Sequence, residues 1–226
     1  MNIPTHDMLR YLKNFISETR LKLFEDKIVN RTKHITLVLE DIYQSQNISA
    51  VIRSADCFGI QDVHVIENHN FFQDNTEISM GASKWINIKR YNTEKRNTIN
   101  AINTLKANDY QIIVTTPHNA DLELFDLNIV ENKTAIVFGS EVDGCSKEVL
   151  EIADKKIRIP MYGFTESFNV SVAVSLCLQY LTYKIRKSNV DWKMSKMEQE
   201  NVLLEWFRNS IKSVEEIEKR YIKDLR

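Results

Sequence analysis

The segment Ile159-Pro-Met-Tyr-Gly-Phe-Thr-Glu-Ser-Phe-Asn169-Val-Ser171 joins two apolar stretches through a loop that carries a proline and a glycine. The short stretch at its start, Lys156–Ile159, is typical of a buried strand. The longer stretch, Val170–Ile185, predicts a strongly apolar helix that Asn169 can cap. Because ligands of open α/β sheets bind outside the carboxyl ends of the strands, this loop is a candidate binding site.

A second glycine-bearing loop precedes this one along the chain. Thr134–Phe138 predicts a strand, and Gly139-Ser-Glu-Val-Asp-Gly144 follows it directly. Two such loops at the ends of neighbouring strands would together line one binding pocket. Ordinary turns with acidic residues near helix starts explain the two loops equally well when they are taken alone.

Farther upstream, short apolar runs rich in β-branched residues alternate with helical stretches. This alternation indicates an α/β fold with a mostly parallel sheet covered by helices on both faces. The further strands are predicted at Ile35–Leu39, Val63–Ile66, Ile86–Ile88 and Gln111–Thr115, and the intervening helices at Ile48–Phe58, Thr98–Asn108 and Lys147–Ala153.

Helical segments flank this α/β region on both sides, since apolar residues recur at helical spacing within 7–27 and 194–226. We therefore divide the chain into a helical extension at 1–31, an α/β domain at 32–187 and a second helical extension at 188–226. Each end carries a charge of +3, while the whole chain carries −1: residues 1–34 hold seven Lys/Arg against four Asp/Glu, and residues 184–226 hold eleven against eight. Local basic clusters favour nucleic-acid binding, and a solvated helical face explains the same charges.

Several classes of protein are disfavoured. No apolar run approaches the roughly 20 residues that span a bilayer, and the start lacks a signal-peptide pattern, so a cytoplasmic protein is expected. The three cysteines are isolated and the five histidines lack ligand spacing, so neither a disulfide framework nor a metal site is expected. The motifs GxGxxG, GxxxxGKS/T, HExxH and GxSxG are absent. Their absence disfavours a Rossmann dehydrogenase, a P-loop enzyme, a zinc protease and an α/β-hydrolase.

The stretch Asn47–Gly59 predicts an amphipathic helix that Asn47 caps and that Gly59 ends in a left-handed conformation. Arg53 lies within it, close to the apolar stripe. Burying an arginine is costly unless it meets an anion. An ion pair with Asp56 or Glu40 is the structural explanation of Arg53, and binding of a substrate anion is the functional one.

Three motifs in order resemble the TrmH (SpoU) family of SPOUT methyltransferases. They are Asn47 with Arg53 six residues later and Gly59 closing the helix; Phe138-Gly-Ser-Glu141 followed by Gly144; and the segment Ile159–Ser171 quoted above. The resemblance covers about residues 32–187. Phe168 departs from it, because the family usually has leucine there.

The resemblance implies a deep trefoil knot in the last part of the sheet, an exception to the unknotted connections of most folds. It also implies that S-adenosylmethionine lies bent in the knot, held mostly by backbone groups of three loops. By position, the expected cofactor-binding residues are Thr116, Gly139, Ile159 and Phe168. Methyl transfer from a sulfonium needs no metal.

The resemblance further implies 2′-O-methylation of a ribose in RNA. Arg53 is expected to contact the substrate phosphate and to assist deprotonation of the hydroxyl; phosphate anchoring is the firmer role, because a guanidinium is a very weak base. Asn47 would orient Arg53 or the ribose. Glu141, Ser167 and Asn169 would shape the site, with Ser167 and Asn169 also capping the last helix, and capping alone is the structural alternative for both.

The flanking helices look like the tRNA-contacting extensions of the family's tRNA enzymes, whose precedent is the guanosine at position 18 of the D-loop. A homodimer through the knot helices is expected, in which one subunit can supply residues to the other's site. A ribosomal-RNA 2′-O-methyltransferase stays open, although too few residues precede the first strand for the extra domain that many of these carry. A guanine-N1 methyltransferase, a non-catalytic RNA-binding protein of the same fold and an NAD- or ATP-binding domain are further alternatives.

Overall fold

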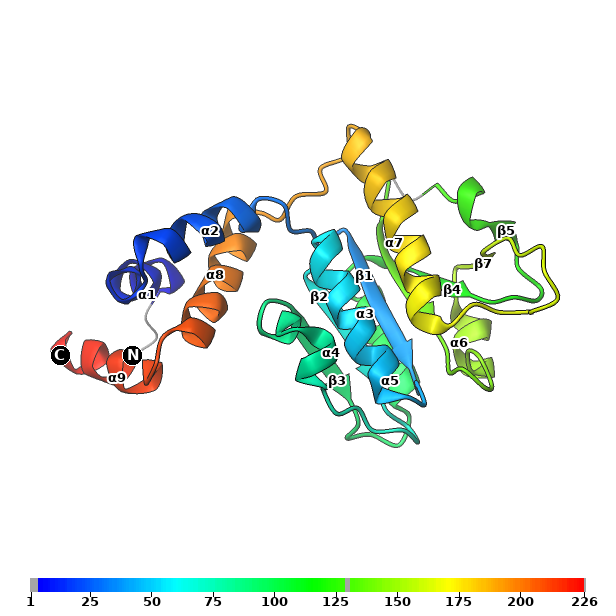
Figure 1. The fold of residues 1–226 in the computed structure, drawn as a ribbon, viewed down its shortest axis with the longest axis horizontal. Coiled ribbons are helices and arrows are strands. Elements are labelled where there is room, and N and C mark those ends of the chain that lie inside the picture. Colours follow the sequence, from blue (N-terminus) through cyan, green and yellow to red (C-terminus); the bar gives the residue numbers. More distant parts are fainter. Residues whose placement is uncertain (1–3, 129–130, 226) are drawn as a thin grey trace. The chain divides into compact units, whose positions relative to one another are not determined.

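The computed structural model describes residues 4–128 and 131–225, which fall into two compact units (Figure 1). The larger unit is Thr32–Trp192, and the smaller consists of Met1–Arg31 together with Lys193–Arg226. The two ends of the chain therefore share one unit. No helix among the described residues is long and apolar enough to cross a membrane.

The larger unit is built on a sheet of seven strands, all of whose pairings are parallel. The strands are β1 (Ile35–Glu40), β2 (Asp62–Ile66), β3 (Asn87–Tyr91), β4 (Tyr110–Thr115), β5 (Leu122–Glu123), β6 (Lys133–Phe138) and β7 (Lys155–Arg158). Their order across the sheet is β3-β2-β1-β6-β4-β7-β5. The predicted parallel sheet is confirmed. Its two-residue edge strand β5 is too short to leave a pattern in the sequence.

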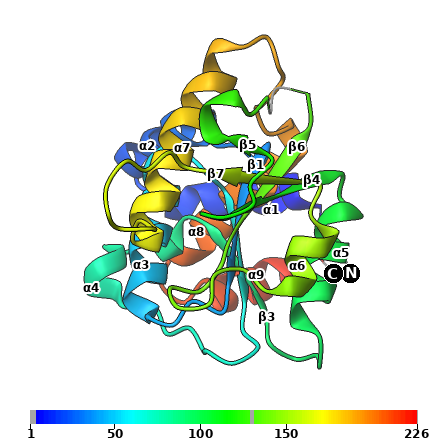
Figure 2. The ribbon, with the colours of Figure 1, turned by 90° about the vertical axis from the view of Figure 1, so that its right-hand side faces the viewer.

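Helices cover both faces of the sheet, as predicted (Figure 2). The helices of this unit are α3 (Ser45–Phe58), α4 (Thr76–Ser79), α5 (Asn97–Lys106), α6 (Lys147–Ile152) and α7 (Val170–Lys187). α3 and α7 pack on one face, and α5 and α6 on the other. The four-residue helix α4 was not among the predicted elements.

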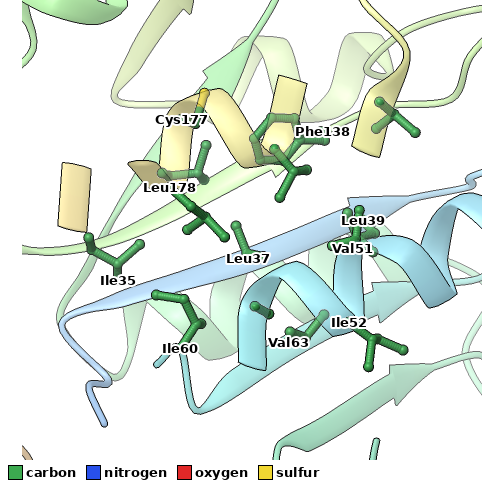
Figure 3. Packing of buried hydrophobic residues seen from close by; sticks show 14 of the residues in the cluster. Ile35, Leu37, Leu39, Val51, Ile52, Ile60, Val63, Phe138, Cys177 and Leu178 are labelled. Carbon is green, nitrogen blue, oxygen red and sulfur yellow. The ribbon is translucent and has the colours of Figure 1, made fainter. Parts of the chain in front are cut away.

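The core follows from the alternation of side chains along β1. Ile35, Leu37 and Leu39 point toward α3 and α7, and all three are fully buried (Figure 3). Val38 points to the opposite face, toward α5. Each such side chain contributes about 1.5–3 kcal/mol to folding when it is fully buried. This central strand therefore holds both helical layers.

A buried carboxylate joins three elements at the carboxyl end of β1. Glu40 is 2% exposed and accepts hydrogen bonds from the Thr98 hydroxyl on α5 (2.7 Å) and from the backbone and hydroxyl of Ser146 (2.9 and 2.7 Å). Ser146 in turn caps α6. Because these contacts satisfy Glu40, it is not available to pair with Arg53.

The smaller unit is helical, as predicted for both ends of the chain. It contains α1 (Thr5–Leu12), the 3-10 turn η1 (Lys13–Phe15), α2 (Glu18–Ile28), α8 (Lys196–Ser210) and α9 (Val214–Asp224). Phe24 on α2 packs against Trp206 on α8, with ring centroids 5.4 Å apart. The continuous helical pattern of 194–226 is split in two, and Ser213 takes a left-handed conformation at the break.

His64 on β2 is a buried imidazole whose Nδ1 lies 2.9 Å from the hydroxyl of Tyr91, while its Nε2 has no hydrogen-bond partner. Burial, together with the positive charge of Lys89 and against the opposing charge of Asp62, lowers the pKa of His64 from 6.5 to about 4. The folded protein therefore keeps this ring neutral well below neutral pH.

We predict that the free energy of unfolding falls between pH 6.5 and pH 4, because only the unfolded chain binds a proton at His64 in that window. The slope for this group approaches about 1.4 kcal/mol per pH unit. Urea denaturation of the wild type and of His64→Phe, at pH 7 and pH 5, measures the effect. An equal loss of stability in both proteins over this window would rule out His64 as its source.

Candidate active site

A cavity of about 620 Å³ opens at the carboxyl ends of β4, β6 and β7. Its walls come from the loops that follow these three strands and from the start of α3. The sequence-predicted residues that line it are Asn47, Thr116, Gly139, Glu141, Ile159, Ser167, Phe168 and Asn169. Residues more than 120 positions apart in the chain are thus brought together as predicted, and Arg53 is not among them.

Glu141 lies at the centre of the hydrogen bonds in this cavity. Its carboxylate accepts the side-chain amide of Asn47 (2.7 Å) and the backbone N–H groups of Tyr43 (2.8 Å) and Gln44 (3.3 Å). Partial burial acts to raise the pKa of Glu141, but these donors outweigh it, and the pKa is lowered overall. Glu141 is therefore an anion at neutral pH and a weak base.

The start of α3 differs from the prediction. The helix begins at Ser45 rather than Asn47, and its N-cap residue, Gln44, makes no side-chain cap bond. Asn47 lies within the first turn and is 9% exposed. Its side-chain amide donates to Glu141, the carboxylate that also accepts the backbone N–H groups before the helix. The predicted left-handed end of α3 at Gly59 is confirmed, with φ of 79°.

Asn169 connects the same cluster to α7. Its Nδ2 donates to Oδ1 of Asn47 (3.1 Å), and its own Oδ1 accepts the backbone N–H of Ser171 (2.9 Å). The predicted cap by Asn169 is thus present. The hydroxyl of Ser167, expected to share in that cap, makes no hydrogen bond within the described part of the chain, and Ser167 lines the cavity.

The loop after β6 is closed on itself. Ser140 and Gly144 exchange two backbone hydrogen bonds of 3.0 Å each. A Cβ atom built on Gly139 would lie 2.1 Å from the carbonyl carbon of Gly144 and 2.2 Å from the nitrogen of Cys145. Only glycine fits at position 139, because the close neighbours are backbone atoms that cannot move aside.

The remaining walls are the loop after β4 and the far part of the loop after β7. The backbone N–H of Thr116 donates to the carbonyl of Ile157 (2.9 Å), and the hydroxyl of Thr116 donates to the carbonyl of His118 (2.9 Å). Phe168 remains 41% exposed at the cavity wall. The imidazole of His118 lies 3.7 Å from the carboxylate of Glu166, so the two loops approach each other across the cavity.

Arg53 is exposed on α3 and has no hydrogen-bond or ion-pair partner among residues 4–128 and 131–225. The predicted alternative, a structural ion pair with Asp56 or Glu40, is therefore wrong for this chain. Ser54, the next residue, bonds to Ser175 on α7 through their hydroxyls (3.1 Å). The guanidinium is therefore unpaired within the described part of the chain.

The SpoU rRNA Methylase family matches residues 34–179, which is the greater part of the chain. The chain belongs to the SpoU methylase family. The matched region holds all three motifs and almost the whole of the larger unit.

Similar proteins extend this SpoU assignment. A curated tRNA (guanosine(18)-2′-O)-methyltransferase of Borreliella burgdorferi is 41% identical over 207 residues, covering 92% of this chain and 93% of the relative. The crystal structure of the TrmH/SpoU tRNA-modifying enzyme of Aquifex aeolicus has a TM-score of 0.77 at 26% identity, covering 87% of this chain and 98% of that one. The SpoU methyltransferase AviRb of Streptomyces viridochromogenes, in complex with AdoMet, has a TM-score of 0.62 at 22% identity, covering 72% of this chain and 65% of that one, a likeness of fold.

Two cavity residues of this SpoU methylase, Gln44 and His118, were not predicted from the sequence. Met161 and Glu166 also line the cavity, within the loop after Ile159 that was predicted as a binding site. Gln44 could have been found from its place three residues before Asn47, on the loop that follows a predicted strand. His118 had no comparable signal, because a single histidine outside a motif is more often a surface residue.

We predict that Gly139→Ala lowers the free energy of unfolding by at least about 2 kcal/mol, because the added methyl overlaps backbone atoms. Gly163→Ala is the matched control, since a Cβ there meets nothing within 4 Å. Urea denaturation gives the stabilities, and hydrogen exchange at the amides of Ser140 and Gly144 reports opening of the loop. Equal stability and exchange in the two variants would contradict the closed loop.

Proposed function

We propose that this chain transfers a methyl group from S-adenosylmethionine to the ribose 2′-hydroxyl of the D-loop guanosine at position 18 of tRNA. The observation that carries the proposal is the hydrogen-bonded cluster of Asn47, Glu141 and Asn169 inside the cavity. The name of the Borreliella relative, which matches over 92% of the chain, supports the choice of tRNA and nucleotide. A tRNA substrate also implies a cytoplasmic protein.

The cavity suits the cofactor. Its volume of about 620 Å³ lies in the range of roughly 300–1,000 Å³ that holds ligands of this size. Gly139 has no side chain, so the cofactor could lie close to its backbone. Thr116, Ile159 and Phe168 would complete the cofactor-binding wall. S-adenosylmethionine supplies an electrophilic methyl group on sulfonium.

The residues of the cluster would act on the ribose by position and charge. Glu141 holds Asn47 in place and, as an anion with a lowered pKa, is a poor acceptor for the hydroxyl proton. Asn47 and Asn169 offer amide groups that can orient the 2′-hydroxyl toward the methyl group. Ser167 adds an unengaged hydroxyl at the same wall. Arg53 would bind the adjoining phosphate and stabilise the negative charge that the 2′-oxygen gains as the hydroxyl proton passes to solvent water.

The placement of Arg53 outside the cavity favours a homodimer in which one copy completes the site of the other. Val172, Leu176 and Tyr183 form an exposed stripe at helical spacing along α7, with 45%, 40% and 62% exposure. An apolar stripe of this kind on a helix beside the site suits a symmetric interface. The hydroxyl contact between Ser54 and Ser175 joins α3, the helix that carries Arg53, to this helix.

Two further features belong to this proposal. The strands β6, β4 and β7 are neighbours in the sheet, and their loops meet in one cavity. A trefoil knot in this part of the chain is proposed from membership of the SpoU family. The helical extension at 1–31, which holds six Lys/Arg against four Asp/Glu, would contact tRNA through this excess. The extension at 188–226 holds eight Lys/Arg and eight Asp/Glu, so it would contribute individual basic side chains rather than a net charge. A ribosomal-RNA substrate is the alternative, suggested by the description of the matched family.

Arg53→Ala should lower kcat/KM for an unmodified tRNA transcript by at least about 100-fold, because the phosphate and the developing charge lose their partner. Arg96→Ala, an exposed arginine paired with Glu148, is the matched control. Methyl transfer is measured with labelled cofactor, and the position is mapped by nuclease digestion and mass spectrometry. Transfer to ribosomal RNA alone would replace the tRNA proposal, and transfer to neither would remove the enzymatic one.

Mixing two inactive variants tests whether Arg53 acts across the dimer. If it does, Arg53→Ala and Asn169→Ala chains together form one intact site per mixed dimer, and a 1:1 mixture should recover about a quarter of wild-type activity. Each variant alone supplies the control. No recovery on mixing, under conditions where the chains exchange, would place Arg53 and Asn169 in the same chain's site.

A further inference from the structure

A tyrosine directly before Gln44, which lines the cavity, is exposed to solvent. Tyr43 is 66% exposed, on the short loop between β1 and α3. Its side chain makes no hydrogen bond or ring contact within residues 4–128 and 131–225. Packing of the larger unit therefore does not explain why this ring is there.

The backbone that carries Tyr43 is held firmly in spite of this exposure. Its N–H and that of Gln44 both donate to Glu141, the centre of the proposed ribose site. At one end of the loop the carboxylate of Asp41 accepts the N–H groups of Asn68 (2.7 Å) and His69 (2.8 Å). The ring is thus presented from a rigid support rather than from a mobile loop.

The other end of the loop is braced as well. The hydroxyl of Ser45 donates to the carbonyl of Phe71 and accepts the N–H of Gln73, each at 3.4 Å. A rigid support lowers the entropy lost when an exposed side chain is immobilised by a ligand. The loop therefore has the properties of a prepared contact surface.

Gln44 adds an unused polar group beside the ring. It lines the same cavity as Asn47 and Glu141, and its side-chain amide has no hydrogen-bond partner within the described residues. The amide is both a donor and an acceptor. A base edge that presents one acceptor next to one donor can pair with it through two hydrogen bonds.

We propose that Tyr43 and Gln44 hold the nucleobase whose ribose is methylated, Tyr43 by stacking on its face and Gln44 by pairing with its edge. This inference rests on the proposed function, since it takes the ribose to lie at Asn47, Glu141 and Asn169. A guanine presents O6 to the amide nitrogen of Gln44 and N1–H to its oxygen. Through Glu141, the loop that selects the base is tied to the residues that orient the sugar.

A second copy of the chain is the competing occupant of this surface. The exposed stripe of Val172, Leu176 and Tyr183 lies on α7, whereas Tyr43 and Gln44 lie on the loop before α3, with Gln44 in the cavity wall. An aromatic face next to an unpaired amide matches a base better than it matches an apolar helix, because stacking and edge pairing are the two contacts that bases offer.

The test uses the full chain and a tRNA transcript in which 2-aminopurine replaces the D-loop guanosine at position 18. This base lacks O6 and N1–H, and its fluorescence reports stacking without any need for methyl transfer. Tyr43→Ala should weaken binding of this transcript by at least about fivefold and reduce the emission change on binding, while Tyr43→Phe keeps both. Phe125→Ala, an exposed aromatic outside this loop, is the control and should match the wild type.

Gln44→Ala is tested with the guanosine and 2-aminopurine transcripts side by side. The wild type should bind the guanosine transcript more tightly than the 2-aminopurine transcript. In Gln44→Ala the ratio of the two Kd or KM values should fall about tenfold, with little change in kcat.

The outcomes separate this inference from the proposed function. Unchanged emission and affinity in Tyr43→Ala, or unchanged preference in Gln44→Ala, overturns it even if the wild type methylates tRNA. If the two variants show the expected changes but the wild type transfers no methyl group, the result would support this inference and remove the enzymatic proposal. A change in self-association of Tyr43→Ala without RNA, measured by ultracentrifugation, would assign the surface to a second copy instead.

Discussion

The hydrogen bonds to the Glu141 carboxylate join segments that are far apart in the chain. Glu141 follows β6, yet it accepts donors from the loop before α3 and from Asn47 in the first turn of that helix. Asn169 extends the connection to the start of α7. A charged acceptor can hold several donors at once, so this carboxylate ties α3 directly, and α7 through Asn169, to the loop after β6. The geometry of the cavity depends on that fixation.

The sheet supplies the support that this anion needs. The alternation of Leu37 and Val38 along β1 commits one face to α3 and α7 and the other to α5. Because both faces are buried, neither helical layer can shift without exposing apolar surface. The polar cluster at the carboxyl ends of the strands therefore rests on a core that resists movement, which suits a site that works by orientation.

Most of the fold could be predicted from the sequence, because strands and helices with buried faces leave a strong periodicity. Eight of the cavity residues could be predicted from glycine loops and from the resemblance of three motifs, whereas Gln44 and His118 were missed. The start of α3 could not, since the acceptor that replaces its cap, Glu141, lies 97 residues from Gln44. The environment of Arg53 could not be predicted either. Ion pairing depends on the distances between helices and strands, and the sequence pattern does not give these distances. The break before α9, at Ser213, has no glycine or proline to mark it.

The closed loop at Gly139 has a consequence for how sequences of this kind can diverge. Steric exclusion by backbone atoms leaves one residue of the twenty at that position, while Gly163 on the neighbouring loop has open space around it. Selection for folding alone is therefore enough to keep position 139 invariant, with or without a ligand. An invariant glycine near a cofactor site therefore need not contact the cofactor. In the same way, a variable residue at position 163 need not lie far from it.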